Sequence, residues 1–106
     1  MPQRYRISPE LLEDVKAELN ITWSDVATTT KVRGYIAGGM FYINDKLGEQ
    51  ADYTADGYPR TLLMEYCRYE RDGALDVFEN NYQSMILAMQ TKKELSRYVE
   101  SAQQTP

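Results

Sequence analysis

The side chains that most often perform acid–base or nucleophilic chemistry are scarce in this sequence. It contains no histidine and a single cysteine, Cys67. Histidine is the commonest general base near neutral pH, and one cysteine without histidine matches none of the usual zinc ligand sets. Cys67 lies in an apolar helical pattern, which predicts a small buried residue instead of a reactive thiol. The sequence therefore predicts no catalytic, cofactor or metal site, and indicates a protein that binds or assembles.

Two further groups of residues have simpler explanations than chemistry. The pair Gly38-Gly39 lacks the spacing and the following lysine of a phosphate-binding loop. The carboxylates of residues 49–79 are numerous, but an acid–base pair needs two carboxyl groups in opposed environments. We interpret these carboxylates as a solvated acidic surface.

The charge is unevenly distributed along the chain. The net charge is −4, and residues 48–80 contain eight acidic residues against three arginines. Sequence-specific DNA binding needs a basic footprint and a helix with clustered Arg, Asn or Gln side chains. Neither is present, so we expect no sequence-specific contact with DNA.

The length of 106 residues suits a single domain covering residues 1–106. A domain this small has a thin core, so partners can complete part of its apolar surface. Residues 1–7 and 103–106 are predicted to be flexible. The sequence has no apolar stretch of about 18 residues and no signal-peptide pattern. We therefore expect no membrane association, and the lone cysteine fits a reducing cytosol.

The elements that must position any binding residues are helices. Ser8 is a good N-cap with Pro9 at the first helical position, and Ile7 and Leu12 fit a hydrophobic staple. This pattern predicts a first helix that ends near Asn20.

A second helix is expected directly afterwards. Thr22 is predicted as its N-cap, with a staple between Ile21 and Val26, and Gly48 as its C-terminal stop.

Three glycines interrupt this second helix. Gly34 and Gly38 are four residues apart, so they favour a helix face that another backbone approaches closely. A kink, a shorter helix, or a strand hairpin at Gly38-Gly39 are the alternatives.

Residues 48–58 are expected to form a long loop, and a third helix is expected over residues 59–71. Tyr53 and Tyr58 in the loop are candidate anchors for a protein partner. The alternative is that they fold back as a lid over the core.

The last helix is expected to run from about residue 74 to residue 102. Its apolar stripe is interrupted at residues 91–94 and resumes, on a displaced face, with Leu95, Tyr98 and Val99. These three residues are candidate interface residues. One long straight helix with a frayed end is the alternative.

These patterns predict an all-α fold: a small bundle of about four helices, with a long loop between the second and third helices and a long C-terminal helix. The predicted core residues are Leu12, Val15, Ile36, Met40, Leu63, Tyr66, Phe78, Tyr82 and Met85.

Three stretches of the chain, residues 66–74, 77–83 and 36–47, resemble the head–tail connector (head-completion) proteins of long-tailed phages. Residues 66–74 look like that family's apolar helix with an aromatic-rich Arg-Tyr end, and residues 77–83 look like the Phe-x-x-x-Tyr motif that opens its last helix. Residues 36–47 are similar to the family's helix that ends in a Tyr-Ile step. The resemblance covers residues 9–90.

The resemblance implies a structural virion protein without enzymatic activity or cofactors, which assembles with itself as a ring of about a dozen subunits. It implies that the ring binds the portal protein and a stopper or tail-completion protein at the head–tail interface, after synthesis in the host bacterial cytoplasm. Double-stranded DNA then passes through the channel, and an acidic lumen lets it slide. The displaced face of the last helix and the polar tail are expected to grip the portal, and the loop between Tyr53 and Tyr58 to face a neighbour or the channel.

Other functions remain open at this point. The chain also fits a small helical adaptor or regulatory protein that binds one protein partner without forming a ring. A helix-turn-helix DNA-binding module is disfavoured by the acidic balance, and an enzyme of unrecognised type is disfavoured by the missing catalytic residues.

Overall fold

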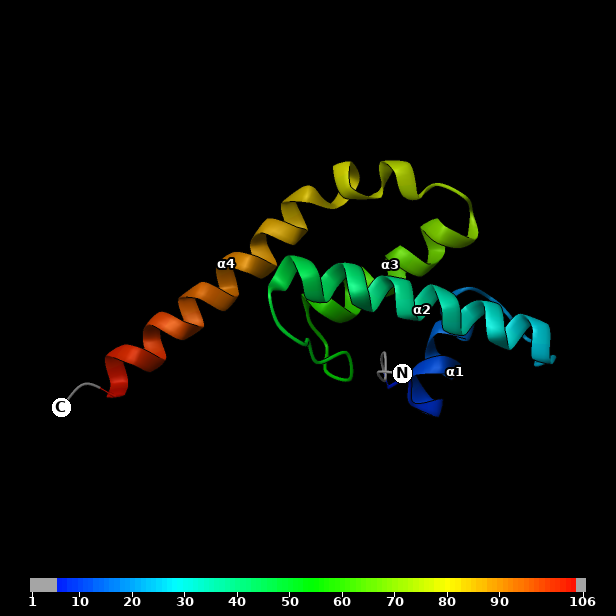
Figure 1. Cartoon of the computed structure of the whole chain (residues 1–106), viewed down its shortest axis with the longest axis horizontal. Coiled ribbons are helices and arrows are strands. Elements are labelled where there is room, and N and C mark those ends of the chain that lie inside the picture. Colours follow the sequence, from blue (N-terminus) through cyan, green and yellow to red (C-terminus); the bar gives the residue numbers. More distant parts are fainter. Residues whose placement is uncertain (1–5, 105–106) are drawn as a thin grey trace, which may run out of the picture.

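The fold consists of helices. The computed structural model describes residues 6–104, and this part contains α1 (Pro9–Glu18), α2 (Val26–Leu47), α3 (Tyr58–Arg71) and α4 (Phe78–Gln104), with a short 3-10 helix over Leu75–Val77 and no strand (Figure 1). The predicted all-α bundle, with a loop between α2 and α3 and a long last helix, is confirmed. No helix among the described residues is long and apolar enough to cross a membrane.

The core lies around α2, which packs most extensively against α3 and also contacts α1 and α4. Of the predicted core residues, six are buried: Leu12, Val15, Ile36, Met40, Leu63 and Phe78. The other three, Tyr66, Tyr82 and Met85, are half-buried and pack against the same core. The core is thus assembled from all four helices, together with two loop residues, Ala51 and Tyr53.

The start of α1 follows the sequence signals. The Ser8 Oγ accepts a hydrogen bond from the Leu11 N–H at 3.1 Å, and Pro9 is the first helical residue. Ile7 packs against the core. After the helix ends, Asn20 adopts a positive φ of 59°, a conformation that asparagine tolerates better than most residues.

Three arginines of α3 hold α1 in place. The contacts are Arg60 Nη2 to Asp14 Oδ2 at 2.7 Å, Arg68 Nη2 to Glu18 Oε2 at 3.1 Å, and Arg71 Nη1 to the Leu19 carbonyl at 2.7 Å. These are the arginines of the acidic middle segment, and two of them are paired with acids of α1. Arg68 also lies 3.5 Å from Glu65, and Arg71 lies 3.0 Å from Asp72, so these arginines compensate acids of both segments.

The start of α2 differs from the prediction. The N-cap is Asp25, whose Oδ2 accepts a hydrogen bond from the Thr28 N–H at 3.0 Å, and Thr22 lies outside the helix. Val26 is 82% exposed, so the predicted staple with Ile21 is wrong. The physical reason is that a carboxylate makes a stronger, charge-assisted cap at the positive end of a helix than a neutral hydroxyl. The predicted end is correct, because Gly48 follows α2 with a φ of 82°.

The glycines of α2 allow a close approach to α3 at one place. The helix continues through them, so there is no strand hairpin at Gly38-Gly39. A Cβ on Gly39 would lie 2.6 Å from Leu63 Cδ1, and one on Gly38 would lie 3.2 Å from the Tyr66 hydroxyl. Gly34 has no neighbour within 4 Å of its Cβ position. The close-packed face is therefore Gly38-Gly39 against α3, and the predicted role of Gly34 in it is wrong.

An aromatic cluster joins α2, α3 and the start of α4. The ring of Phe78 lies 5.0–5.7 Å from the rings of Tyr42, Tyr66, Tyr69 and Tyr82. Three of these contacts are edge-to-face, a favourable geometry for aromatic pairs. Phe78 is 1% exposed and is the centre of the cluster.

The chain does not form one uninterrupted helix from residue 74. The 3-10 turn precedes α4, and α4 itself bends at Tyr82, whose φ of −114° and ψ of 16° are not helical. The Tyr82 hydroxyl donates to Glu65 Oε1 at 3.1 Å, so the bent segment is attached to α3. Burial and this hydrogen bond raise the pKa of Tyr82 to about 12.

The molecule is elongated because α4 extends beyond the bundle (Figure 1). Its radius of gyration is 15.5 Å, against about 13 Å for a compact chain of this length, and its longest dimension is 57 Å. The helix includes Gln103 and Gln104, where the sequence predicted a flexible tail. Of the other positions predicted to be flexible, residues 6 and 7 are described, with Ile7 packed against the core, and residues 1–5 and 105–106 lie outside the described residues.

Candidate protein-interaction surface

The middle of α4 is fixed to the C-terminal end of α2. The Gln90 side-chain amide donates to the Lys46 carbonyl at 2.8 Å, and the Lys93 ammonium donates to the Leu47 carbonyl at 2.6 Å. The last carbonyls of a helix have no partner within the helix, and a cation there also interacts favourably with the helix dipole. These two contacts set the direction in which the rest of α4 leaves the bundle.

Beyond Lys93 the helix leaves the core. Every described side chain from Glu94 to Glu100 is exposed, including Leu95 at 61%, Tyr98 at 72% and Val99 at 44%. This arrangement agrees with the predicted displaced face and not with a continuation of the core stripe. We call residues 94–104 the arm.

One more leucine belongs to this exposed face. Leu87 is 61% exposed, and it lies eleven residues, or about three helical turns, before Tyr98. We call Leu87, Leu95, Tyr98 and Val99 the α4 strip, which extends about 18 Å along the helix. The sequence analysis missed Leu87, because it stands beside the core residues Ile86 and Met89, although its spacing to Tyr98 was a usable signal.

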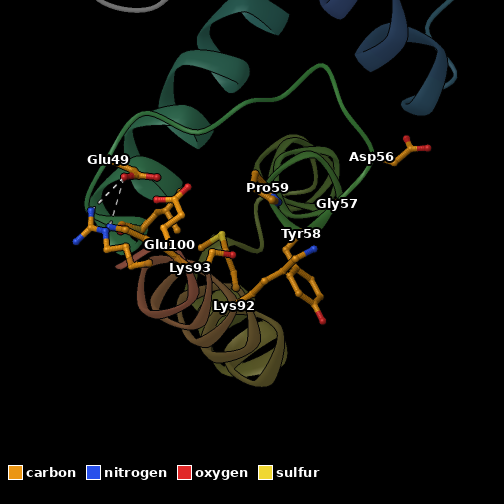
Figure 2. Close-up of a pocket in the computed structure, with 12 residues that line it drawn as sticks. Glu49, Asp56, Gly57, Tyr58, Pro59, Lys92, Lys93 and Glu100 are labelled. Carbon is orange, nitrogen blue, oxygen red and sulfur yellow. Dashed lines mark hydrogen bonds and ion pairs between the residues drawn. The ribbon is translucent and has the colours of Figure 1, made fainter. Parts of the chain in front are cut away.

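A groove of about 390 Å³ lies beside the arm, between α4, the loop after α2 and the start of α3 (Figure 2). The Glu49 carboxylate lies 3.7 Å from Lys93 Nζ and 3.4 Å from Arg97 Nη2. Lys92 Nζ lies 6.0 Å from the centre of the Tyr58 ring. The cations of the groove thus already have partners, so it is a mixed polar surface and not an anion site.

The predicted interface residues divide into two groups. Leu95, Tyr98 and Val99 lie together on the arm, and Tyr58 lies close to them, because Lys92 contacts the Tyr58 ring and lines a shallow hollow with Leu95 and Val99. Tyr58 is 36% exposed. These four residues therefore face solvent on one side of the molecule.

Tyr53 does not belong with them, which corrects its prediction as a partner anchor. It is 4% exposed, and its hydroxyl donates to Asn44 Oδ1 at 2.7 Å. Its carbonyl accepts a hydrogen bond from Arg60 at 2.9 Å. Burying the ring while its hydroxyl and carbonyl keep hydrogen bonds is more favourable than exposing it, so Tyr53 forms the lid over the core.

The character of this surface follows from the groups that are exposed on it and from those that are not. The Cys67 side chain is fully buried, and burial raises the pKa of its thiol to about 12, so it is protonated at neutral pH. In the part of the chain that the structure describes, no group of three or more His, Cys, Asp or Glu side chains is placed to hold a metal ion. Exposed apolar side chains gathered on one helix face are typical of interaction sites.

The fold and this surface together define an all-α chain with exposed apolar side chains along its last helix. No protein-family model matches the chain, and neither a curated protein nor a solved structure shows significant similarity to it.

Proposed function

We propose that this chain is a non-enzymatic structural protein of a long-tailed phage, which forms a ring at the head–tail junction between the portal and the stopper or tail. The observation that carries the proposal is the exposed apolar strip on an arm that leaves the bundle. A chain of 106 residues that keeps four large apolar side chains in solvent on one helix face is built for assembly.

The acidic middle segment supports a role beside DNA. Six of its eight acidic residues are exposed: Glu49, Asp52, Asp56, Asp72, Asp76 and Glu79. Three of these six, Asp52, Asp56 and Asp76, have no ion-pair partner among the described side chains, whereas Glu49, Asp72 and Glu79 do. An acidic surface that lines a channel repels the phosphate backbone, so that DNA passes without sticking.

The fold also fits the resemblance in residues 66–83. The Arg-Tyr segment ends α3, and Phe78 and Tyr82 open α4 and stack on each other with ring centres 5.0 Å apart. Phe78 and Tyr82 of the Phe-x-x-x-Tyr motif therefore pack the bent start of α4 against α3, and the arm beyond it extends past the end of α2 (Figure 1).

The test is electron microscopy of lysates from the phage or prophage that encodes the chain, after deletion of its gene. We expect full heads and separate, unattached tails, and normal particles when the wild-type gene is supplied in trans. A complementing gene with Tyr98→Asp should fail, whereas Phe41→Asp, which changes an exposed apolar residue of α2 outside the strip, should restore the particles.

Normal tailed particles in the deletion lysate would refute the connector role. The chain would then fit the alternative, an adaptor that binds one protein partner through the same strip.

A further inference from the structure

A second apolar surface lies at the opposite end of the molecule from the arm. It is a hollow of about 410 Å³ between the connection from α1 to α2, the N-terminal half of α2 and the end of α3. Its lining residues are Leu19, Ile21, Trp23, Ala27, Thr28, Lys31, Val32, Tyr35 and Arg71. We call it the Trp23 pocket.

Trp23 is held in a fixed position at the edge of this pocket. Its indole N–H donates to the Thr28 hydroxyl at 2.8 Å, and that hydroxyl donates to Asp25 Oδ1 at 2.8 Å. The polar atom of the indole is therefore satisfied, although 55% of the residue is exposed. A preorganised tryptophan with an exposed apolar ring is the kind of residue that dominates protein interfaces.

The pocket presents one cation without an ion-pair partner. Lys31 has no ion-pair partner within residues 6–104. Arg71, by contrast, binds Asp72 through Nε at 3.0 Å and the Leu19 carbonyl through Nη1. The carboxylate of Asp25 accepts hydrogen bonds from Thr28 of the lining. A partner that fits this pocket should bring apolar side chains together with carboxylates.

The α4 strip has that composition. Glu94 precedes Tyr98 by one helical turn, Glu100 follows Val99, and neither carboxylate has an ion-pair partner among the described side chains. The nearby Arg97 is paired with Glu49, and Lys92 lies over the Tyr58 ring. The strip therefore presents apolar side chains with two acids and one cation, Lys92, that have no ion-pair partner among the described side chains, which leaves it net acidic.

The two surfaces of one chain do not meet. Figure 1 shows the arm at one end of the long axis and the start of α2 at the other end. The long axis measures 57 Å. Two complementary patches at separate places on one chain make a head-to-tail contact between copies, and such a contact closes into a ring when the rotation allows it.

We propose that the α4 strip of one copy docks into the Trp23 pocket of the next copy. This proposal specifies the two surfaces that form the contact between neighbouring subunits. Its ring geometry rests on the proposed function. It assigns the strip to a neighbouring copy, whereas the resemblance assigned that face to the portal.

The test uses two variants that each remove one half of the contact. Trp23→Ala impairs the pocket and keeps the strip, and Tyr98→Asp impairs the strip and keeps the pocket; both residues are exposed, so both variants should fold. The mass of each is measured by light scattering after gel filtration, up to a concentration of about 1 mM, which detects contacts with a Kd near that value. We expect concentration-dependent multimers for the wild type and monomers for each variant alone.

The mixture of the two variants is decisive. One intact strip and one intact pocket remain, on different chains, so an equimolar mixture should form one-to-one dimers and nothing larger. A face-to-face contact between two strips predicts a different result, in which Trp23→Ala multimerises like the wild type. That result overturns the pocket contact, because a contact between two strips is two-fold and closes as a dimer. The deletion phenotype tests the proposed function separately.

Cysteine cross-linking covers a contact too weak for the mass measurement. Ala27→Cys places a thiol in the pocket and Leu95→Cys places one on the strip, while the native Cys67 is buried and does not compete. The mixed disulfide should form much faster than either homodimer and faster than the disulfide of Ala27→Cys with Phe41→Cys. If the mixed pair forms no faster than this control and the wild type is monomeric throughout, the docking contact is wrong.

Discussion

The aromatic cluster makes the stability of the fold depend on one phenylalanine, and the chain supplies its own control. The sequence contains two phenylalanines, of which Phe78 is 1% exposed and Phe41 is 63% exposed. Truncating both to alanine removes the same atoms from opposite environments. The difference between Phe78→Ala and Phe41→Ala therefore measures the contribution of the buried site.

The magnitude follows from the burial and the neighbours of Phe78. Removing a buried phenylalanine ring loses about 1.5–3 kcal/mol of transfer free energy. A residual cavity and the loss of ring contacts that are worth about 0.5–1.5 kcal/mol per pair bring the total to about 3–5 kcal/mol. The four tyrosines around the ring belong to three different elements, so the cavity does not collapse easily. For Phe41→Ala we expect less than about 0.5 kcal/mol.

The assay is urea unfolding followed by circular dichroism at 222 nm, with thermal unfolding in parallel. The midpoint temperature of Phe78→Ala should fall by about 12–40 °C, since a loss of 1 kcal/mol lowers the midpoint by about 4–8 °C in a domain of this size. If the free energies of unfolding of the two variants agree within about 1 kcal/mol, the ring is not central to the core and the packing argument is wrong.

Three further predictions concern packing, charge and the arm. Gly39→Ala should lower the free energy of unfolding by about 1–3 kcal/mol, because its Cβ would lie 2.6 Å from Leu63 Cδ1. Gly34→Ala, which has open space around it, should raise the free energy of unfolding by up to about 1 kcal/mol. Chemical denaturation measures both values, and a stabilised Gly39→Ala would contradict the close approach. Burial raises the pKa of Glu70, whose Oε1 is buried without a hydrogen-bond partner. The folded state therefore binds the carboxyl proton of Glu70 more tightly than the unfolded state. The stability that this proton contributes falls as pH rises through the raised pKa. The stability of Glu70→Gln relative to the wild type should therefore be greater at pH 7 than at pH 4 in urea titrations, and an equal difference at both values would contradict the burial argument. Removing residues 95–106 should leave the helical spectrum and the melting temperature of the bundle nearly unchanged while it abolishes self-association in light scattering; a truncated chain that fails to fold would show that the arm belongs to the core.

The sequence predicted the features that depend on local chemistry. Ser8 with Pro9 and the left-handed Gly48 have few competing roles, so both helix boundaries are where we expected them. Thr22 and Asp25 are both good caps, so the sequence pattern left two candidates for the start of α2. The structure has the stronger, charge-assisted cap of Asp25.

The interaction surface was predictable only in part. The interrupted apolar pattern located Leu95, Tyr98 and Val99, because periodicity along one helix is a local property. The burial of Tyr53 depends on Asn44 and Arg60, which lie in the helices before and after its loop, and the contact of Gly39 with Leu63 depends on the packing of two helices. No local pattern carries such information.

The attachment of α4 to the end of α2 has a consequence for how the arm behaves in solution. The arm is eleven residues long, and an isolated peptide shorter than about 12–15 residues is rarely helical in water. Here the nucleus is supplied by the segment fixed through Gln90 and Lys93, so the arm only has to propagate an existing helix. Part of the ordering entropy is thus lost before any partner arrives. Substitutions that favour or break the helix at arm positions outside the proposed contact should therefore shift the association constant for binding between copies. The helicity of the arm would then affect this association separately from the contacts themselves.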